Sequence, residues 1–195
     1  MDICEFVKSF EDYSDLSDEE ILDLQSLYLS DNRLTSLPES IGNLTNLEEL
    51  DLSCNHLTSL PESIGKLRNL KELDLSRNQL TSLPESIGNL EELYLSNNQF
   101  TFLPESIGNL SNLKYLGLSH NQFTFLPESL GNLSNLKYLG LSHNQLNDQA
   151  QNVLRNLVMT NSVITQLLTD NFDFSKELER KGEKRKIIYF KKDWS

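Results

Sequence analysis

The sequence has little cysteine, comparatively few basic residues and no long apolar run. Cys4 and Cys54 are its only cysteines and lie far apart, which fits a reducing compartment better than an oxidising one. The 17 basic residues stand against 29 acidic ones, so the formal net charge is −12. Because nucleic acids bind through basic surfaces, this charge argues against a nucleic-acid partner.

Signals for export and for membrane insertion are also missing. The N-terminus, MDICEFVKSFEDY, lacks the basic start and the apolar run of a secretory signal peptide. No stretch approaches the length that spans a bilayer. We therefore expect a cytoplasmic protein, or one that is secreted into a host cytoplasm without a cleaved signal peptide.

Motifs that carry catalysis or bind metals are absent as well. The sequence has no glycine-rich phosphate loop, no metal-ligand spacing and no nucleophile within a known motif. We expect a protein that is not an enzyme and that has no cofactor and no metal site. The stacking of His120 and His143 on adjacent strands is the nearest approach to a metal pair, and no third ligand accompanies it.

Leucine recurs at regular intervals instead. The common pattern is L-x-x-L-x-L-S-x-N-x-[LF]-[TN], which all but the last unit continue as x-L-P-E-S-[IL]-G-x-L. The spacing is 23 residues, except for 20 in the third unit, where three residues are missing near Ile87. Six units begin at Leu24, Leu47, Leu70, Leu90, Leu113 and Leu136.

This pattern resembles the leucine-rich repeat, in particular the intracellular class with LPxxIGxL in its second half. That class includes Ras-suppressor-like, Scribble-like and plant Ras-group-related repeat proteins. The resemblance covers about Leu24 to Leu146 and implies an α/β solenoid. It implies an arc with a parallel β-sheet on the concave side, short helical turns on the convex side and helical caps at both ends.

The repeated letters have physical reasons. Alternating leucines point inward from a short strand, and the residues between them point outward. An inward asparagine bonds backbone groups that the turn leaves unpaired; it recurs at Asn32, Asn55, Asn78, Asn98, Asn121 and Asn144. We expect each proline to open a short helical turn and each glycine of PESIG to leave it in a left-handed conformation. Phe100 and Phe123 replace leucine at a core position.

The two ends have a different character from the repeats, and we expect three parts. Residues 1–23 form an N-terminal helical cap, with an amphipathic helix from Asp2 to about Asp12 and a second turn capped by Ser17 and Glu20. Residues 24–149 form the repeat array of six units, the last one degenerate. Residues 150–195 form a helical C-terminal cap and a basic tail.

Within the C-terminal part, Asn147 or Asp148 caps a helix whose apolar face is Val153, Leu154, Leu157 and Val158. A second helix carries Ile164, Leu167 and Leu168. Further on, 176–181 suits a helix, and 186–190 suits a strand or an extended docking segment. We favour a solvated tail over two alternatives, contact with an anionic membrane surface and folding back onto the acidic part of the chain.

The outward strand positions vary between units, while the inward positions do not. We therefore expect a partner to be recognised through the variable outward positions. The outward residues of the earlier units are mainly acidic, and those of the later units are mainly aromatic. Gly117 and Gly140 leave room beside the tyrosines for an inserted group. The candidate partner-binding residues are Glu49, Asp51, Glu72, Asp74, Arg77, Glu92, Tyr94, Tyr115, His120, Tyr138 and His143.

From these features we predict a non-catalytic protein interaction module. Its partner is a protein or peptide with a basic portion, which the carboxylates attract, and an apolar anchor, which the tyrosines contact. The resemblance implies signalling partners, and the near-identity of units also fits a pathogen effector. The alternative is a substrate-recruiting adaptor subunit of a ubiquitin ligase or another multi-subunit enzyme.

One smaller feature allows two interpretations. Phe102 and Phe125 lie directly before the leucine of LPES, at the position that serine holds in the earlier units. They form either a second exposed apolar patch or a pair whose rings pack on each other, and we favour the second.

Overall fold

The computed structural model describes residues 2–161, 166–169 and 188–189. Its helices and 3-10 turns are α1 (Ile3–Lys8), η1 (Glu11–Tyr13), α2 (Asp18–Leu22), η2 (Glu39–Asn43), η3 (Glu62–Lys66), η4 (Glu105–Asn109), η5 (Glu128–Asn132) and α3 (Asp148–Thr160). Its strands are β1 (Ser26–Tyr28), β2 (Glu49–Asp51), β3 (Glu72–Asp74), β4 (Glu92–Tyr94), β5 (Tyr115–Gly117), β6 (Tyr138–Gly140), β7 (Gln166–Leu168) and β8 (Ile188–Tyr189).

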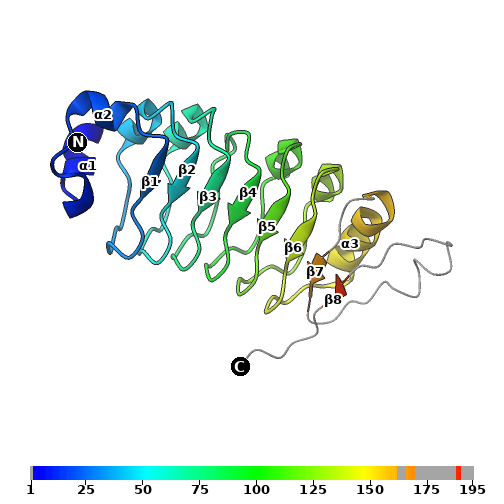
Figure 1. Ribbon diagram of the computed structural model, residues 1–195. Helices are drawn as coiled ribbons and strands as arrows, with labels where there is room; N and C mark the ends of the chain where they lie inside the picture. Colours follow the sequence, from blue (N-terminus) through cyan, green and yellow to red (C-terminus); the bar gives the residue numbers. More distant parts are fainter. Residues whose placement is uncertain (1, 162–165, 170–187, 190–195) are drawn as a thin grey trace.

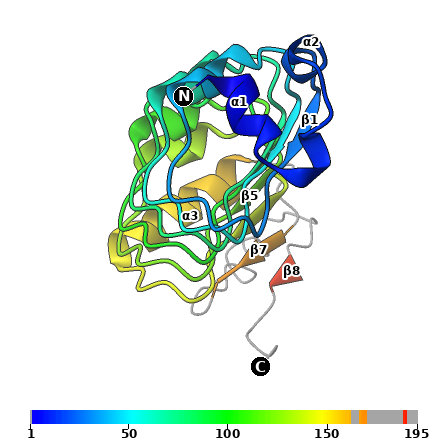
Figure 2. The same cartoon turned by 90° about the vertical axis from the view of Figure 1, so that its left-hand side faces the viewer.

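The strands form one parallel sheet in which chain order and spatial order agree. Equivalent residues of successive units stand opposite each other, as Leu27, Leu50 and Leu73 do. The 3-10 turns lie across the coil from the sheet, and the units stack into an open arc (Figure 1). Figure 2 shows the same coil end-on, with the sheet along one side. The predicted solenoid is therefore confirmed.

The interior of the coil is filled by the repeated leucines. Leu50 and Leu52 are 1% and 0% exposed, and their counterparts in the other units are equally buried. Phe100 and Phe123 are fully buried, and their rings are nearly parallel with centroids 6.2 Å apart. Burying each such side chain stabilises the fold by about 1.5–3 kcal/mol, so the predicted core positions carry most of the stability.

The asparagine ladder is confirmed from Asn55 onward, but the prediction is wrong for Asn32, which is exposed and donates to the Ser30 carbonyl of its own unit. The Asn55 amide nitrogen donates to the carbonyl oxygens of Leu29 at 2.8 Å and Leu52 at 3.0 Å, and its oxygen accepts from the Leu34 amide at 2.8 Å. Asn78, Asn98 and Asn121 repeat this arrangement and are buried. Each amide joins two successive units, because the groups it bonds belong to both.

The prediction for the PESIG segments is wrong in two details. Pro38 lies one position before its 3-10 turn, at the N-cap with an extended backbone, and the other capping prolines do the same. No glycine in the described residues has a left-handed backbone. Gly42 lies inside its turn, where an added Cβ would stand 2.6 Å from the Ser63 carbonyl oxygen. Close stacking of turns requires the glycine there, not a left-handed exit.

The left-handed backbone occurs instead just before each ladder asparagine. Asp31, Cys54, Arg77, Asn97, His120 and His143 all have φ between 55° and 59°. Each of the first five donates its backbone N–H to a serine carbonyl of the next unit, for example Cys54 to Ser76 at 2.9 Å. A non-glycine residue pays about 1–2 kcal/mol for this conformation, which these inter-unit bonds offset.

The third unit differs on its convex side, as its shorter length predicts. Between β3 and β4, where every residue is described, the chain forms no 3-10 turn, although Pro84 is present. Leu90 is fully buried and both closes this unit and opens the next. The deletion therefore removes a convex turn and leaves the sheet register intact.

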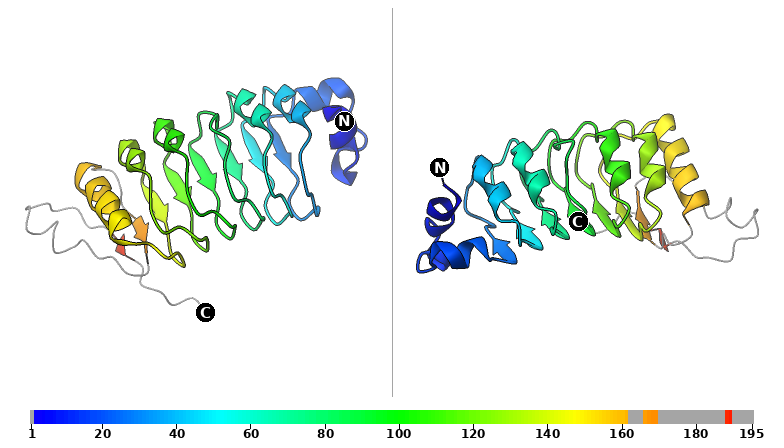
Figure 3. Two further views of the ribbon diagram at one scale, coloured as in Figure 1. Left: turned by 180° about the vertical axis from the view of Figure 1, so that it is seen from behind. Right: turned by 90° about the horizontal axis from the view of Figure 1, so that it is seen from above.

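The N-terminal cap covers the first unit with two short helices (Figure 3). The first, α1, ends at Lys8, earlier than predicted, and η1 follows it. The capping box of Ser17 and Glu20 is present. The Tyr13 hydroxyl accepts from the Tyr28 amide at 2.9 Å, so a side chain occupies the free edge of the sheet and blocks pairing with another strand.

At the other end, α3 covers the last unit as predicted, with Asn147 as N-cap and the predicted apolar face buried. The predicted second helix is wrong, because Leu167 lies in strand β7, opposite Leu139. The edge of β6 offers unpaired backbone groups, and pairing with them outweighs a helical pattern of three apolar residues. Ile164 lies outside the described residues.

The strand alternative for 186–190 is confirmed at Ile188 and Tyr189, which pair with β7. The predicted helix at 176–181 and most of the basic tail lie outside the described residues.

Candidate protein-binding surface

The outward positions of β1–β6 form one continuous surface, which we call the concave face. The candidate strand residues Glu49, Asp51, Glu72, Asp74, Glu92, Tyr94, Tyr115 and Tyr138 all belong to it, and each is partly exposed. Arg77, His120 and His143 lie three positions beyond their strands and are exposed. The repeat thus brings all eleven candidates to one side of the sheet.

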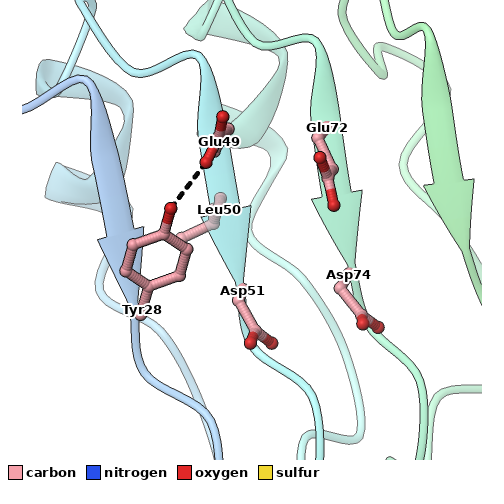
Figure 4. A pocket seen from close by; sticks show the side chains of 6 residues that line it. All are labelled: Tyr28, Glu49, Leu50, Asp51, Glu72 and Asp74. Atoms are coloured by element: carbon pink, nitrogen blue, oxygen red, sulfur yellow. Dashed lines mark hydrogen bonds between the residues drawn. The ribbon is translucent and has the colours of Figure 1, made fainter.

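The first half of the concave face is a cluster of carboxylates around a hollow. Glu49 stands opposite Glu72, and Asp51 stands opposite Asp74, on neighbouring strands. The hollow has a volume of about 80 Å³, and Figure 4 shows the side chains around it. Its lining is Tyr28, Glu49, Leu50, Asp51, Glu72 and Asp74. The Tyr28 ring therefore forms an aromatic wall beside the four acids, while Leu50 adds little apolar surface because it is 1% exposed.

Three of these acids are held in place by hydrogen bonds. Glu49 accepts from the Tyr28 hydroxyl at 2.6 Å, as Figure 4 shows. Asp51 and Asp74 each accept from the backbone amide two residues on, Ser53 and Ser76, at 2.8 Å. These bonds fix the orientation of the carboxylates before any partner arrives, which lowers the entropy lost on binding.

Glu72 is the exception in this cluster, because its carboxylate makes no hydrogen bond to any described residue. Burial raises the pKa of its carboxyl, and the negative charges of Glu92 and Glu49 raise that pKa further. Like charges directly opposite on a sheet are destabilising. A cation bound among these carboxylates would relieve this repulsion.

The second half of the concave face is a stack of tyrosine rings. The centroids of Tyr94 and Tyr115 are 4.7 Å apart, and those of Tyr115 and Tyr138 are 4.0 Å apart with the rings within 3° of parallel. Burial raises the pKa of Tyr94 and of Tyr115, and hydrogen bonds to Glu92 and to Tyr138 add to this. The hydroxyls therefore stay protonated and able to donate.

The space beside the tyrosines is not open in the way that the sequence suggested. Gly117 and Gly140 are buried. A Cβ added to Gly140 would lie 3.0 Å from the Tyr138 hydroxyl oxygen and 3.2 Å from the Ser119 hydroxyl oxygen. The tyrosine rings themselves lie over the glycines, so the expected room for an inserted group is filled. The result is a flat aromatic surface rather than a cavity.

The histidine pair lies next to this stack. The rings of His120 and His143 are 4.0 Å apart and 15° from parallel. Among the described residues, no group of three or more His, Cys, Asp or Glu side chains is arranged to hold a metal ion. The pair contributes an exposed aromatic strip along the edge of the tyrosine stack.

Sequence reasoning missed two features of the molecule. Tyr28 walls the hollow, and its place in the same outward column as Asp51 and Asp74 was the available signal. A second series of asparagines links the convex connections, as Asn69 does by donating to the Thr45 carbonyl at 2.9 Å. An asparagine directly before a leucine in every full-length connection was the sequence signal for this second series.

The apolar patch outside the concave face is present. Phe102 and Phe125 are 45% and 46% exposed. Their rings do not form a stacked or edge-on pair among the described aromatic contacts. These observations support an exposed apolar patch, whereas from the sequence alone we favoured mutual packing of the two rings.

Within the described residues, no helix has the length and apolar character needed to cross a bilayer. What the fold defines is a repeat solenoid with a broad, continuous face on its parallel sheet. The family model described as "Leucine rich repeat" matches residues 23–86 and 88–146. The chain therefore belongs to the leucine-rich repeat family, whose members generally act as protein–protein interaction modules and are typically non-catalytic.

Two solved structures are similar to this chain. An internalin (inlF) from Listeria monocytogenes has 23% sequence identity over 89% of this chain and 49% of its own, with a TM-score of 0.72. A leucine-rich repeat protein from Leptospira interrogans has 31% identity over 86% of this chain and 55% of its own, with a TM-score of 0.53. The chain thus spans about half the length of each. Among curated proteins, none matches the chain.

Proposed function

We propose that the protein is a non-catalytic module that binds a protein or peptide on its concave face, through a basic portion and an apolar anchor of that partner. The observation that carries this proposal is the division of one continuous surface into a carboxylate half and a tyrosine half. The inward residues of these strands are uniform, so only the outward ones distinguish one region of the array from another.

The carboxylate half supports a basic portion in the partner. Four acids on β2 and β3 face the same way, and three of them are already oriented by hydrogen bonds. Charge complementarity of this kind raises the rate of encounter and excludes acidic partners, among them nucleic acids.

The tyrosine half supports an apolar anchor. Three stacked rings present apolar area together with hydroxyl donors, and tyrosine is enriched among the residues that dominate binding energy. The rings lose little freedom on binding because they already pack on each other. His120 and His143 border this half, Arg77 follows β3 at the border of the carboxylate half, and all three would contact the flanks of a partner.

The biological setting is part of the same proposal. The LPxxIGxL pattern supports a signalling role in the cytoplasm, and the near-identical units also fit an effector delivered into a host cytoplasm. Both settings require the same concave face, so the binding test below applies to either.

Affinity capture with matched variants tests the proposal. Extract of the native cell, or of a host cell, is passed over the wild-type chain, over Tyr115→Ala/Tyr138→Ala and over Phe102→Ala/Phe125→Ala. Each double variant removes two aromatic rings, the tyrosines from the fifth and sixth units and the phenylalanines from the fourth and fifth, but only the first removes them from the concave face. We expect specific partners on the wild type and on the phenylalanine variant, and their loss from the tyrosine variant. Equal capture by all three proteins would refute a concave-face site.

A further inference from the structure

The two halves of the concave face lie at a fixed distance from each other. The carboxylate hollow lies between β2 and β3, and the closest ring pair, Tyr115 with Tyr138, lies between β5 and β6. The strands between them pair in unbroken register. Three strand spacings of about 4.8 Å separate the two centres, which gives about 14 Å.

This distance selects the conformation of a bound segment. In an extended chain, residues i and i+4 point to the same side and are about 13–14 Å apart. In an α-helix, residues on the same face recur at i+7 and i+11, which are about 10.5 and 16.5 Å apart. The separation of about 14 Å matches the extended chain and falls between the two helical repeats.

We propose that the partner presents an extended segment that crosses the strands, with a lysine or arginine in the hollow and an apolar side chain on the Tyr115–Tyr138 pair about four residues away. This inference rests on the proposed function and specifies the partner of the same surface. It names the chemistry of two contact residues and the spacing between them.

The composition of the hollow fits a long basic side chain rather than a small cation. The exposed Tyr28 ring provides apolar surface for an aliphatic stem. The carboxylates of Glu49, Glu72 and Asp74 provide acceptors for the charged head. Long basic side chains bury their stems along apolar surface while the head stays polar, and tyrosine faces attract cations.

The surface between the two centres suits an extended backbone. Tyr94 stands opposite Asp74 on one side and Gly117 on the other. Its hydroxyl is turned along its own strand, where it donates to Glu92. Beyond it, the Tyr115 ring lies over Gly117, so a segment would lie along a flat aromatic surface from the hollow to the ring pair.

A peptide selection tests this inference. A displayed library of random peptides of about twelve residues, long enough to span both centres, is panned against the immobilised full chain. We expect enrichment of peptides that carry lysine or arginine about four residues from an aromatic or aliphatic residue, in either order. Affinities of the enriched peptides are then measured by fluorescence polarisation.

Three variants assign each contact. Glu72→Gln/Asp74→Asn should weaken the enriched peptides about tenfold or more and remove the basic preference from a repeated selection. Tyr115→Ala/Tyr138→Ala should weaken binding to a similar degree and remove the apolar preference. Glu62→Gln/Glu85→Gln, on the convex side, should leave both affinity and preference unchanged.

The outcomes separate this inference from the proposed function. Peptides that depend on the concave residues but show no preferred spacing, or the helical spacings of seven and eleven, would overturn the extended-segment inference alone. Peptides that bind all variants equally would overturn the concave-face function as well. A selection that enriches no peptide above a surface without protein would also count against the inference.

Discussion

The asparagine ladder makes a demanding prediction about stability at Asn78. Its side-chain oxygen accepts from the Leu57 amide at 2.9 Å, and its nitrogen donates to the carbonyls of Leu52 at 2.9 Å and Leu75 at 3.1 Å. Asn78→Ala leaves the Leu57 amide without a partner inside the coil, whereas the Leu52 and Leu75 carbonyls each lose one of two bonds and keep those from Asn55 and Asn98. The unsatisfied amide costs about 1–3 kcal/mol and each of the two lost hydrogen bonds about 0.5–1.5 kcal/mol, so we expect a loss of about 2–6 kcal/mol. This is a large part of the stability of an ordinary domain.

Urea unfolding followed by circular dichroism measures the effect, and Asn32→Ala is the matched control. Asn32 holds the same repeat position at the end of the ladder, but it is exposed, and its side chain donates only to Ser30 within the described residues. The control should lose no more than about 1 kcal/mol. Since each unit contacts its neighbours, Asn78→Ala should also separate unfolding into two steps. A single transition with a loss below about 1 kcal/mol would refute the account of the ladder.

Three other predictions concern single positions. Glu72→Gln should stabilise the protein at pH 7 by about 0.5 kcal/mol, because it removes a repelled carboxylate. Since folding raises the pKa of Glu72, protonation favours the folded state, and the advantage of the variant should shrink as pH falls through that pKa; a constant difference would contradict this. Gly65→Ala should lower the free energy of unfolding by about 1–3 kcal/mol, because the added Cβ would collide with Ser86. In the control Gly131→Ala the added Cβ meets no atom within 4 Å, so thermal stability should change little. Equal losses in the two variants would exclude the close-approach explanation. Ser63→Ala should raise the melting temperature slightly, by removing a buried hydroxyl without a partner, and a lower one would show that the hydroxyl is satisfied.

The repeat frame was predictable because each of its letters has a local physical reason. Inward leucines, the ladder asparagine and the start of the 3-10 turns follow from alternation and from backbone groups that need partners. Because every unit has the same requirements, the reasoning for one unit applies to all six. Comparing the units with one another also distinguished the variable outward positions, which include the candidate residues, from the invariant inward positions.

Other features depended on contacts between distant residues. The glycines of the convex turns are required by the neighbouring unit, as the approach of Gly42 to Ser63 shows, and not by their own backbone angles. Leu167 joins a strand because the edge of β6 is open, although its local pattern suits a helix.

The sequence by itself determined the coil, its register and the side of the sheet on which Glu49, Glu72, Tyr115 and Tyr138 lie, because a fixed repeat with alternating side chains permits only one such arrangement. Only the tertiary structure decided that Tyr138 lies over Gly140, that its ring stacks on Tyr115, and that Tyr28 forms a wall of the acidic hollow. The physical reason is that rotamers and pockets arise from packing between neighbouring units, which the pattern within one unit does not specify.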